Sequence, residues 1–160
     1  MERTFKIIYT SDTHGHIFPV NYAAGCGESS GLLNLAAQID KNGNTLVLDG
    51  GDSLQGTPLV QYYLAHADEF PHHPVAEAFN AMGCDYFTLG NHDFNFGYDA
   101  LHAYLCAMDG VCLCANVQDL GGALPLLPET VHTLKNGLRI GITGIVTDYV
   151  NVWEQPQNLK

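Results

Sequence analysis

The sequence predicts an α/β fold, with a mostly parallel sheet flanked by helices and a hairpin near the C-terminus. Short β-rich segments with the composition of buried strands alternate with helical segments along most of the chain. Strands that are joined through helices pair in parallel with right-handed crossovers. Asn136-Gly137 lies between two β-rich runs, which is the typical signal for a type I′ turn and therefore predicts the hairpin.

Each element follows from local pattern. We expect strands at residues 5–10, 45–48, 86–89 and 111–115, and a hairpin built from residues 129–134 and 138–143. We expect helices at residues 31–41, 57–67, 75–82 and 98–108. Ser29 or Ser30 is the expected N-cap of the first helix, Pro58 is tolerated in the first turn of the second, and Gly83 closes the third. Residues 143–150 resemble a further strand that leads into a loop.

Composition narrows the functional class. With 160 residues the chain has the length of one domain, and 46% apolar against 14% charged residues indicates a globular fold. Seventeen acidic and six basic residues give a net charge of −11, which disfavours a nucleic-acid polymer or an anionic membrane as partner.

Five cysteines, an odd number, suggest free thiols, and Cys112 and Cys114 are expected to be buried in the core. His66, His72 and His73 are expected to be solvated, and His132 to lie in a strand.

The N-terminus runs directly into the first expected strand. It contains neither a signal-peptide pattern nor an apolar stretch of membrane length. As written, the sequence therefore favours a cytoplasmic location, although a leader that had been removed would leave the same pattern.

Three polar motifs each follow an expected strand: Asp12-Thr13-His14, Gly51-Asp52-Ser53-Leu54-Gln55-Gly56, and Gly90-Asn91-His92-Asp93. In an open α/β sheet the carboxyl ends of the strands face the ligand crevice, so these motifs are expected to converge at one edge. Carboxylate, imidazole and amide ligands suit divalent metals. Two metals that share a carboxylate activate water and hold phosphoryl oxygens, which suits hydrolysis of phosphate esters.

Single residues in these motifs have simpler explanations. A lone Asp at a strand end is usually a turn or cap residue, a lone His is usually structural, and Asn91 is compatible with a left-handed turn. His16 lies either in the phosphate pocket or merely in a loop. The joint occurrence of three motifs, each behind a strand, favours a metal site.

The pattern Asp-x-His, Gly-Asp-x-x-Gln-Gly and Gly-Asn-His-Asp resembles the calcineurin-like metallophosphoesterase superfamily. Residues 51–59, residues 90–97 and the stretch Trp153-Glu154-Gln155-Pro156 resemble its branch of 5′-nucleotidases and 2′,3′-cyclic-nucleotide phosphodiesterases. The likeness runs through nearly the whole chain. It implies that residues 1–160 are the N-terminal half of a four-layer αββα catalytic domain.

The resemblance also implies residue roles. Two divalent ions such as manganese, zinc or iron would be held by four residues: Asp12 and His14 on the first ion, Asp52 between both, and Asn91 on the second. His92 would act on the phosphate or the leaving group of a nucleotide or similar ester, and His16 would line the same pocket. Asn95 stands where typical 5′-nucleotidases have an Asp that orients this His, which favours the cyclic-nucleotide phosphodiesterases.

The resemblance is incomplete. Members of the superfamily complete the site with a Gly-His-x-His motif, and nothing after Asn116 matches it. We therefore expect a truncated catalytic domain, without its C-terminal ligand half and substrate-binding domain, that is poorly active alone and pairs with that half or with another chain. The family is often periplasmic or secreted, which opposes the cytoplasmic expectation. The alternative is a non-catalytic fragment that binds a metal or a partner, whereas a Rossmann module is excluded because no Gly-x-Gly-x-x-Gly follows the first strand.

Overall fold

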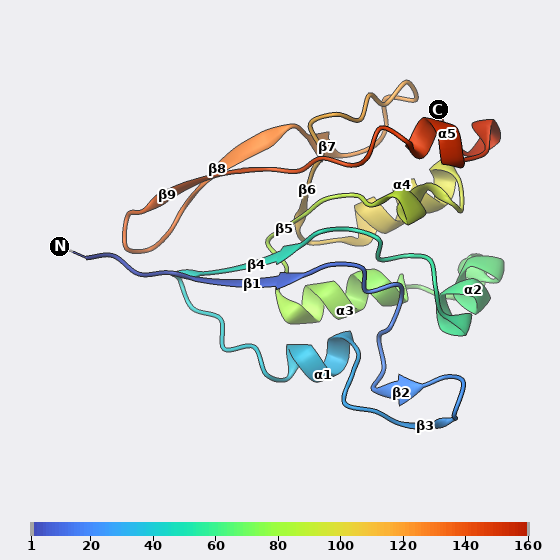
Figure 1. Ribbon diagram of the computed structural model, residues 1–160, viewed down its shortest axis with the longest axis horizontal. Coiled ribbons are helices and arrows are strands. Elements are labelled where there is room, and N and C mark those ends of the chain that lie inside the picture. The colour runs from blue at the N-terminus through green and yellow to red at the C-terminus, as the bar shows by residue number, and fades with distance from the viewer. Residues whose placement is uncertain (1, 160) are drawn as a thin grey trace.

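The protein is built around a five-stranded parallel sheet, as the alternating pattern predicts (Figure 1). The computed structural model describes residues 2–159. The strand order is β1-β4-β5-β6-β7. These strands are β1 (Lys6–Thr10), β4 (Thr45–Asp49), β5 (Tyr86–Phe87), β6 (Val111–Leu113) and β7 (Leu126–Leu127). Because all pairs in this sheet are parallel, the loops that follow the strands open at one edge.

Helices precede β4, β5 and β6 along the chain, and one more follows β9 (Arg139–Thr143). They are α1 (Leu32–Ala36), α2 (Pro58–Ala65), α3 (Pro74–Met82), α4 (Tyr98–Ala107) and α5 (Val150–Trp153), with 3₁₀ turns η1 (Ala67–Glu69), η2 (Asn91–Phe94) and η3 (Pro156–Asn158). Thr57 caps α2, with its hydroxyl accepting from the Val60 N–H, and Pro58 follows as the first helical residue. Gly83 closes α3 in the left-handed conformation with φ 68°.

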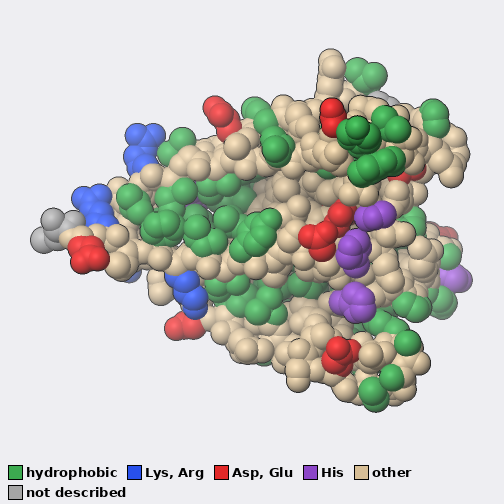
Figure 2. Space-filling model, viewed as in Figure 1, with side chains coloured by type: hydrophobic (Ala, Val, Ile, Leu, Met, Phe, Trp, Pro, Cys, Tyr) green, Lys and Arg blue, Asp and Glu red, His purple; other side chains and the backbone are tan. Residues whose placement is uncertain are grey.

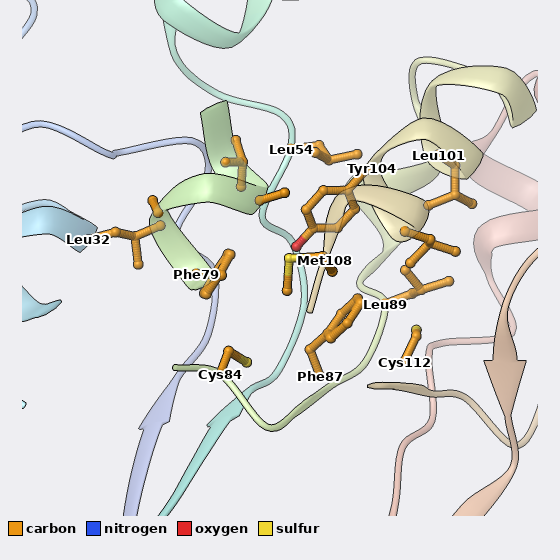
Figure 3. Close-up of a cluster of buried hydrophobic side chains, with 14 of the residues drawn as sticks. Leu32, Leu54, Phe79, Cys84, Phe87, Leu89, Leu101, Tyr104, Met108 and Cys112 are labelled. Carbon is orange, nitrogen blue, oxygen red and sulfur yellow. The ribbon is translucent and has the colours of Figure 1, made fainter. Parts of the chain in front are cut away.

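One face of the sheet carries the core. Phe79 of α3, Phe87 of β5 and Tyr104 of α4 are fully or almost fully buried and belong to one apolar cluster (Figure 3). Cys112 and Cys114, at 2% and 3% exposure, belong to the same cluster, which confirms their expected burial. Burial of large apolar side chains by helices on this face is the main stabilising contribution of the fold.

The opposite face of the sheet is partly open. Along β1 the side chains alternate, so that Ile8 packs against the core while Ile7 and Tyr9 remain 49% and 63% exposed. Hydrophobic side chains gather over the strands on the left of the face shown in Figure 2. A groove of about 200 Å³ between this face and β9 (Arg139–Thr143) is lined by residues that include Tyr86 and Ile142.

The predicted hairpin is present, but its turn differs from the prediction. Strands β8 (Glu129–Thr133) and β9 pair antiparallel, with Thr133 opposite Arg139, and His132 lies in β8 as expected. A type I′ turn needs positive φ at two residues, whereas only Gly137, with φ 80°, has it here. The Gly137 N–H donates to the Leu134 oxygen, and the Leu134 N–H to the Leu138 oxygen. This is a three-residue loop with Gly in the left-handed position.

The first helix is shorter than predicted and is capped differently. Neither Ser29 nor Ser30 caps it, since Gly31 is the N-cap with φ 85°. The Leu32 and Leu33 N–H groups instead donate to the backbone oxygens of His16 and Ile17. The chain at His16–Ile17 therefore satisfies the helix N-terminus without a side chain.

Four other segments differ from expectation. Residues 143–150 form no further strand beyond the end of β9, and the chain enters α5 at Val150. The two-residue strands β2 (Val20–Asn21) and β3 (Cys26–Gly27) pair within the loop after β1, and β7 extends the main sheet; none of the three is predicted.

Within residues 2–159, no helix has the length and apolar character that crossing a bilayer requires.

The expectation that His73 is solvated is wrong. Its side chain is 4% exposed, and its Nδ1 caps α3 by accepting from the Ala76 N–H. The His73 ring lies 5.2 Å from that of Tyr104, centroid to centroid. Burial lowers the pKa of His73 from 6.5 to about 4, because the charged ring would lose its hydration.

Candidate metal centre

The loops after β1 and β4 are joined by backbone hydrogen bonds. The Asp12 N–H donates to the Gly51 oxygen and the His14 N–H to the Asp52 oxygen, both at 2.9 Å. These bonds continue the pairing of the two parallel strands beyond their ends. The first two polar motifs therefore lie side by side because the sheet register places them there.

The backbone of this region is strained at the predicted ligands. Asp12, His14 and Asp52 have φ of 55°, 48° and 57°, and they are the non-glycine residues with positive φ among residues 2–159. L-residues adopt this conformation rarely, and each instance costs free energy. Strain of this kind collects at functional sites, where it directs side chains that regular structure would turn elsewhere.

The same three side chains converge. One potential ligand atom from each of Asp12, His14 and Asp52 lies within 4.8 Å of the others, and we call these residues the carboxylate corner. The Nδ1 of His14 donates to the Gln55 oxygen at 2.7 Å, which leaves Nε2 as the ring's acceptor. Metal-binding histidines commonly have this backbone partner. On the face shown in Figure 2, histidine and acidic side chains gather next to each other.

Asp93 connects the loops of β4 and β5. Its carboxylate, 1% exposed, accepts from the backbone N–H groups of Asp52, Ser53 and Leu54 in one loop and of Gly90 in the other, at 2.8–3.0 Å. Burial raises the pKa of Asp93, and these hydrogen bonds oppose that increase. The last residue of the Gly-Asn-His-Asp motif therefore acts as a structural tie between two motifs.

The two loops also approach very closely. A Cβ on Gly90 would lie 2.2 Å from the Asp52 Oδ1, so no larger residue fits without moving one loop. The His92 N–H donates to the same Oδ1 at 2.7 Å. Asp52 is thus fixed by contacts to the β5 loop, while Asn91, one residue before His92, begins η2 at the same edge.

His92 lies next to the carboxylate corner. Its ring centroid is 5.6 Å from that of His14. The Nδ1 of His92 is 2.8 Å from the Asn95 Oδ1, so Asn95 takes the orienting position expected from the sequence. Asn91, His92 and Asn95 line one cavity of about 330 Å³ together with Val150, Trp153 and Glu154.

His16 occupies a different place. It lines an open groove of about 680 Å³ that also includes Asp12, and its ring faces Tyr22 at a centroid distance of 6.0 Å. The structure therefore brings Asp12, His14, Asp52 and His92 together and places His16 in the neighbouring groove. The ligand and catalytic roles expected for these residues stay predictions.

Sequence reasoning missed Asp49, the last residue of β4. Its carboxylate is 4% exposed and accepts from the Thr10 and Ser53 hydroxyls and the Gly51 N–H. Burial raises its pKa from 3.8 to about 6. An acidic residue that ends an otherwise apolar strand was the available signal, because a buried carboxylate needs such partners.

This parallel sheet, with three polar loops at the carboxyl ends of its strands, agrees with the metallophosphoesterase superfamily that the sequence resembles. The profile of the calcineurin-like phosphoesterase family matches residues 5–158, and the chain belongs to that family.

The chain is similar to two curated relatives over nearly its whole length. It is 31% identical to the trifunctional nucleotide phosphoesterase protein YfkN of Bacillus subtilis, with 97% of this chain and 12% of YfkN covered. It is also 31% identical to the 2′,3′-cyclic-nucleotide 2′-phosphodiesterase/3′-nucleotidase of Salmonella typhimurium, with 94% of this chain and 26% of that protein covered. The chain thus spans about a quarter or less of the length of these relatives.

The fold agrees with a solved structure. The crystal structure of the calcineurin-like phosphoesterase YfkN from Bacillus subtilis superimposes with a TM-score of 0.78 at 31% identity. The match covers 92% of this chain and 49% of the crystallised chain.

Proposed function

We propose that this protein takes part in metal-dependent hydrolysis of phosphate esters, and that its substrates are nucleotides or cyclic nucleotides. The observation that supports this most strongly is the convergence of the Asp12, His14 and Asp52 ligand atoms within 4.8 Å, next to the ring of His92. A phosphate ester needs cations at its oxygens and a proton donor or acceptor near the leaving oxygen.

The donor set fits hard or borderline divalent cations. Carboxylate oxygens and one imidazole suit manganese, zinc or iron. Asp12 and His14 would hold a first ion, Asp52 would share its carboxylate with a second, and the Asn91 amide oxygen would complete the protein's contribution to the second. Bound cations supply positive charge at the phosphoryl oxygens and increase the acidity of water.

His92 is assigned to the substrate rather than to a metal. Its Nδ1 is engaged by Asn95, which leaves Nε2 for the ester in the cavity that both residues line. There it would neutralise charge on the phosphate or exchange a proton with the leaving oxygen. His16 would act only on substrate that extends into the neighbouring groove.

The substrate class rests on two observations. The names of both relatives describe nucleotide phosphoesterases, one of them for 2′,3′-cyclic nucleotides. Asn95 at the orienting position favours the cyclic substrates. We therefore rank 2′,3′-cyclic nucleotides before 5′-nucleotides as substrates.

Hydrolysis by the metal-stripped protein tests the proposal. After treatment with a chelator, Mn²⁺ should restore cleavage of bis-p-nitrophenyl phosphate and of 2′,3′-cyclic AMP. Asp52→Ala should lower the restored rate by at least about 100-fold, because loss of a direct metal ligand should cost more than loss of a group that only hydrogen-bonds to a ligand. Asp68→Ala, an exposed aspartate of η1, is the matched control and should keep the rate. Equal rates for Asp52→Ala and wild type would remove Asp52 from the mechanism.

A second outcome has a separate meaning. Mn²⁺ binding that depends on Asp52, without hydrolysis by residues 1–160, would support the alternative of a metal-binding fragment. Activity that appears only when a further segment or another chain is supplied would support the expected pairing. The exposed apolar face around Ile7 and Tyr9 is consistent with such a partner.

A further inference from the structure

A carboxylate lies behind the pair formed by His92 and Asn95. The Asn95 Nδ2 donates to the Glu154 Oε2 at 2.5 Å, while the Asn95 Oδ1 is 2.8 Å from the His92 Nδ1. The three side chains form one continuous hydrogen-bonded line, and we call them the histidine corner. Glu154 comes from the end of α5, 59 residues after Asn95.

The order of donors and acceptors in this line is fixed by chemistry. An ionised carboxylate only accepts, so the amide group that faces Glu154 has to be the NH₂ group of Asn95. The amide oxygen then faces His92, and because it also only accepts, the His92 Nδ1 has to carry a proton. Nε2 is left as the nitrogen for substrate, both in the neutral ring and in the imidazolium, since Nδ1 is protonated in each.

Glu154 is itself held in place. Its Oε1 accepts from the Gln155 N–H at 2.7 Å and from the Asn158 Nδ2 at 2.8 Å. The Asn158 amide also donates to the Asn95 backbone oxygen at 3.1 Å. Partial burial alone would raise the pKa of Glu154, but these donors outweigh it and the pKa is lowered. The carboxylate is therefore fixed in position and in its charged form.

We propose that Glu154 is a positioning residue for His92, acting through Asn95 to set the orientation of the amide and to keep a proton on Nδ1. The pair of Asn95 and Glu154 thereby keeps the proton on Nδ1, as one directly bonded carboxylate would. The inference rests on the proposed function for the role of His92 toward the ester, but the orientation itself is independent of turnover.

Nitrogen NMR of the His92 ring tests the orientation without any need for activity. In long-range ¹H–¹⁵N spectra on the alkaline side of the histidine titration, wild-type His92 should show a protonated Nδ1 and an unprotonated Nε2. Glu154→Gln is isosteric, but its own NH₂ group lets the Asn95 amide face either way. We expect a mixture of both ring tautomers in this variant, and an unchanged spectrum would overturn the inference.

A reciprocal exchange separates positioning from general damage. In the double variant Asn95→Asp with Glu154→Gln, the carboxylate at position 95 bonds to His92 directly. The new amide at position 154 donates to that carboxylate, so the hydrogen bond between the two positions is kept with its direction reversed. The Nδ1–H tautomer should return in this variant. Glu129→Gln, the same chemical change at an exposed residue of β8, is the control and should leave the His92 spectrum unchanged.

Kinetics connect the orientation to the reaction. An alkoxide leaving group needs a proton, whereas p-nitrophenolate leaves without one. Glu154→Gln should therefore lower kcat about tenfold on 2′,3′-cyclic AMP, less than about threefold on bis-p-nitrophenyl phosphate, and leave KM unchanged. Equal losses on both substrates would contradict a role through His92. Absence of hydrolysis by the wild-type protein, both alone and with a further segment or another chain supplied, would overturn the proposed function and leave the NMR result to decide on Glu154.

Discussion

The two corners of the candidate site are held by different means. In the carboxylate corner, the backbone directs the side chains through three strained φ angles and through hydrogen bonds between loops. In the histidine corner, side chains hold one another, and Glu154 is contributed from 59 residues away. The first corner is therefore a product of sheet register. The second depends on how the segment after β9 packs against η2, so it is the corner whose geometry side-chain substitutions can change.

Asp93→Asn should disturb both corners, because Asp93 ties together the two loops on which they depend. An amide presents an NH₂ group to backbone donors that now meet a carboxylate. We expect a loss of about 3 kcal/mol in the free energy of unfolding, measured with urea, together with weaker Mn²⁺ binding. Asp109→Asn, an exposed aspartate after α4, is the control. A variant as stable as wild type would show that Asp93 is not the tie described.

His14→Ala should affect the carboxylate corner alone. Removal of a direct ligand is expected to weaken Mn²⁺ binding at least about 100-fold by calorimetry, while the His92 tautomer stays unchanged. His72→Ala, at an exposed histidine, should leave the affinity at the wild-type value. Loss of the Nδ1–H tautomer in His14→Ala would mean that the corners are not independent.

The pH dependence of stability reports on a group that lies outside both corners. His73 has a pKa of about 4 in the fold and 6.5 when unfolded, so its contribution is complete above pH 6.5 and is lost as pH falls toward 4. The loss between pH 7 and pH 5 is about 2 kcal/mol, at about 1.4 kcal/mol per unit.

His73→Asn keeps an N-cap side chain on α3 and removes this titration. Urea unfolding at pH 7 and pH 5 should therefore show a smaller decrease in stability for the variant than for wild type. The difference between the two proteins is needed because Asp49, whose pKa is raised to about 6, contributes stability as pH falls through that value. An equal decrease in both proteins would contradict the burial of a neutral His73.

The smallest expected effect concerns the link between the carboxylate corner and the helices. The Thr57 hydroxyl donates to the Gly15 oxygen, one residue after His14, and caps α2. Thr57→Ala should cost about 1 kcal/mol of unfolding free energy, with little change in metal affinity. Thr57→Ser retains the hydroxyl and is the control. A large loss of affinity in Thr57→Ala would show that His14 is positioned by α2 as well as by β4.

The sequence predicts the parallel sheet and the carboxylate corner for the same reason. Strand composition and the residues directly after each strand are local signals, and the register of β1 with β4 brings Asp12 and Asp52 to one edge. Burial of His73 is not visible locally, because the Pro-flanked stretch that contains it looks polar while tertiary packing covers it with Tyr63 and Tyr104.

The role of Glu154 is hidden for a different reason. Asn95 in place of an Asp suggests that His92 lacks a carboxylate, and only the fold reveals that one approaches from the distant α5 segment. The turn at Asn136-Gly137 is misjudged because the same dipeptide suits both a two-residue loop and the three-residue loop that the strand register selects.

Anomalous diffraction from crystals grown with Mn²⁺ shows whether the carboxylate corner binds a metal ion. We expect a peak within about 2.0–2.2 Å of the Asp12 and Asp52 carboxylates and the His14 Nε2, and its loss in Asp52→Ala. A protein that crystallises in the same form with no peak there, or with Mn²⁺ bound only by other residues, would contradict it.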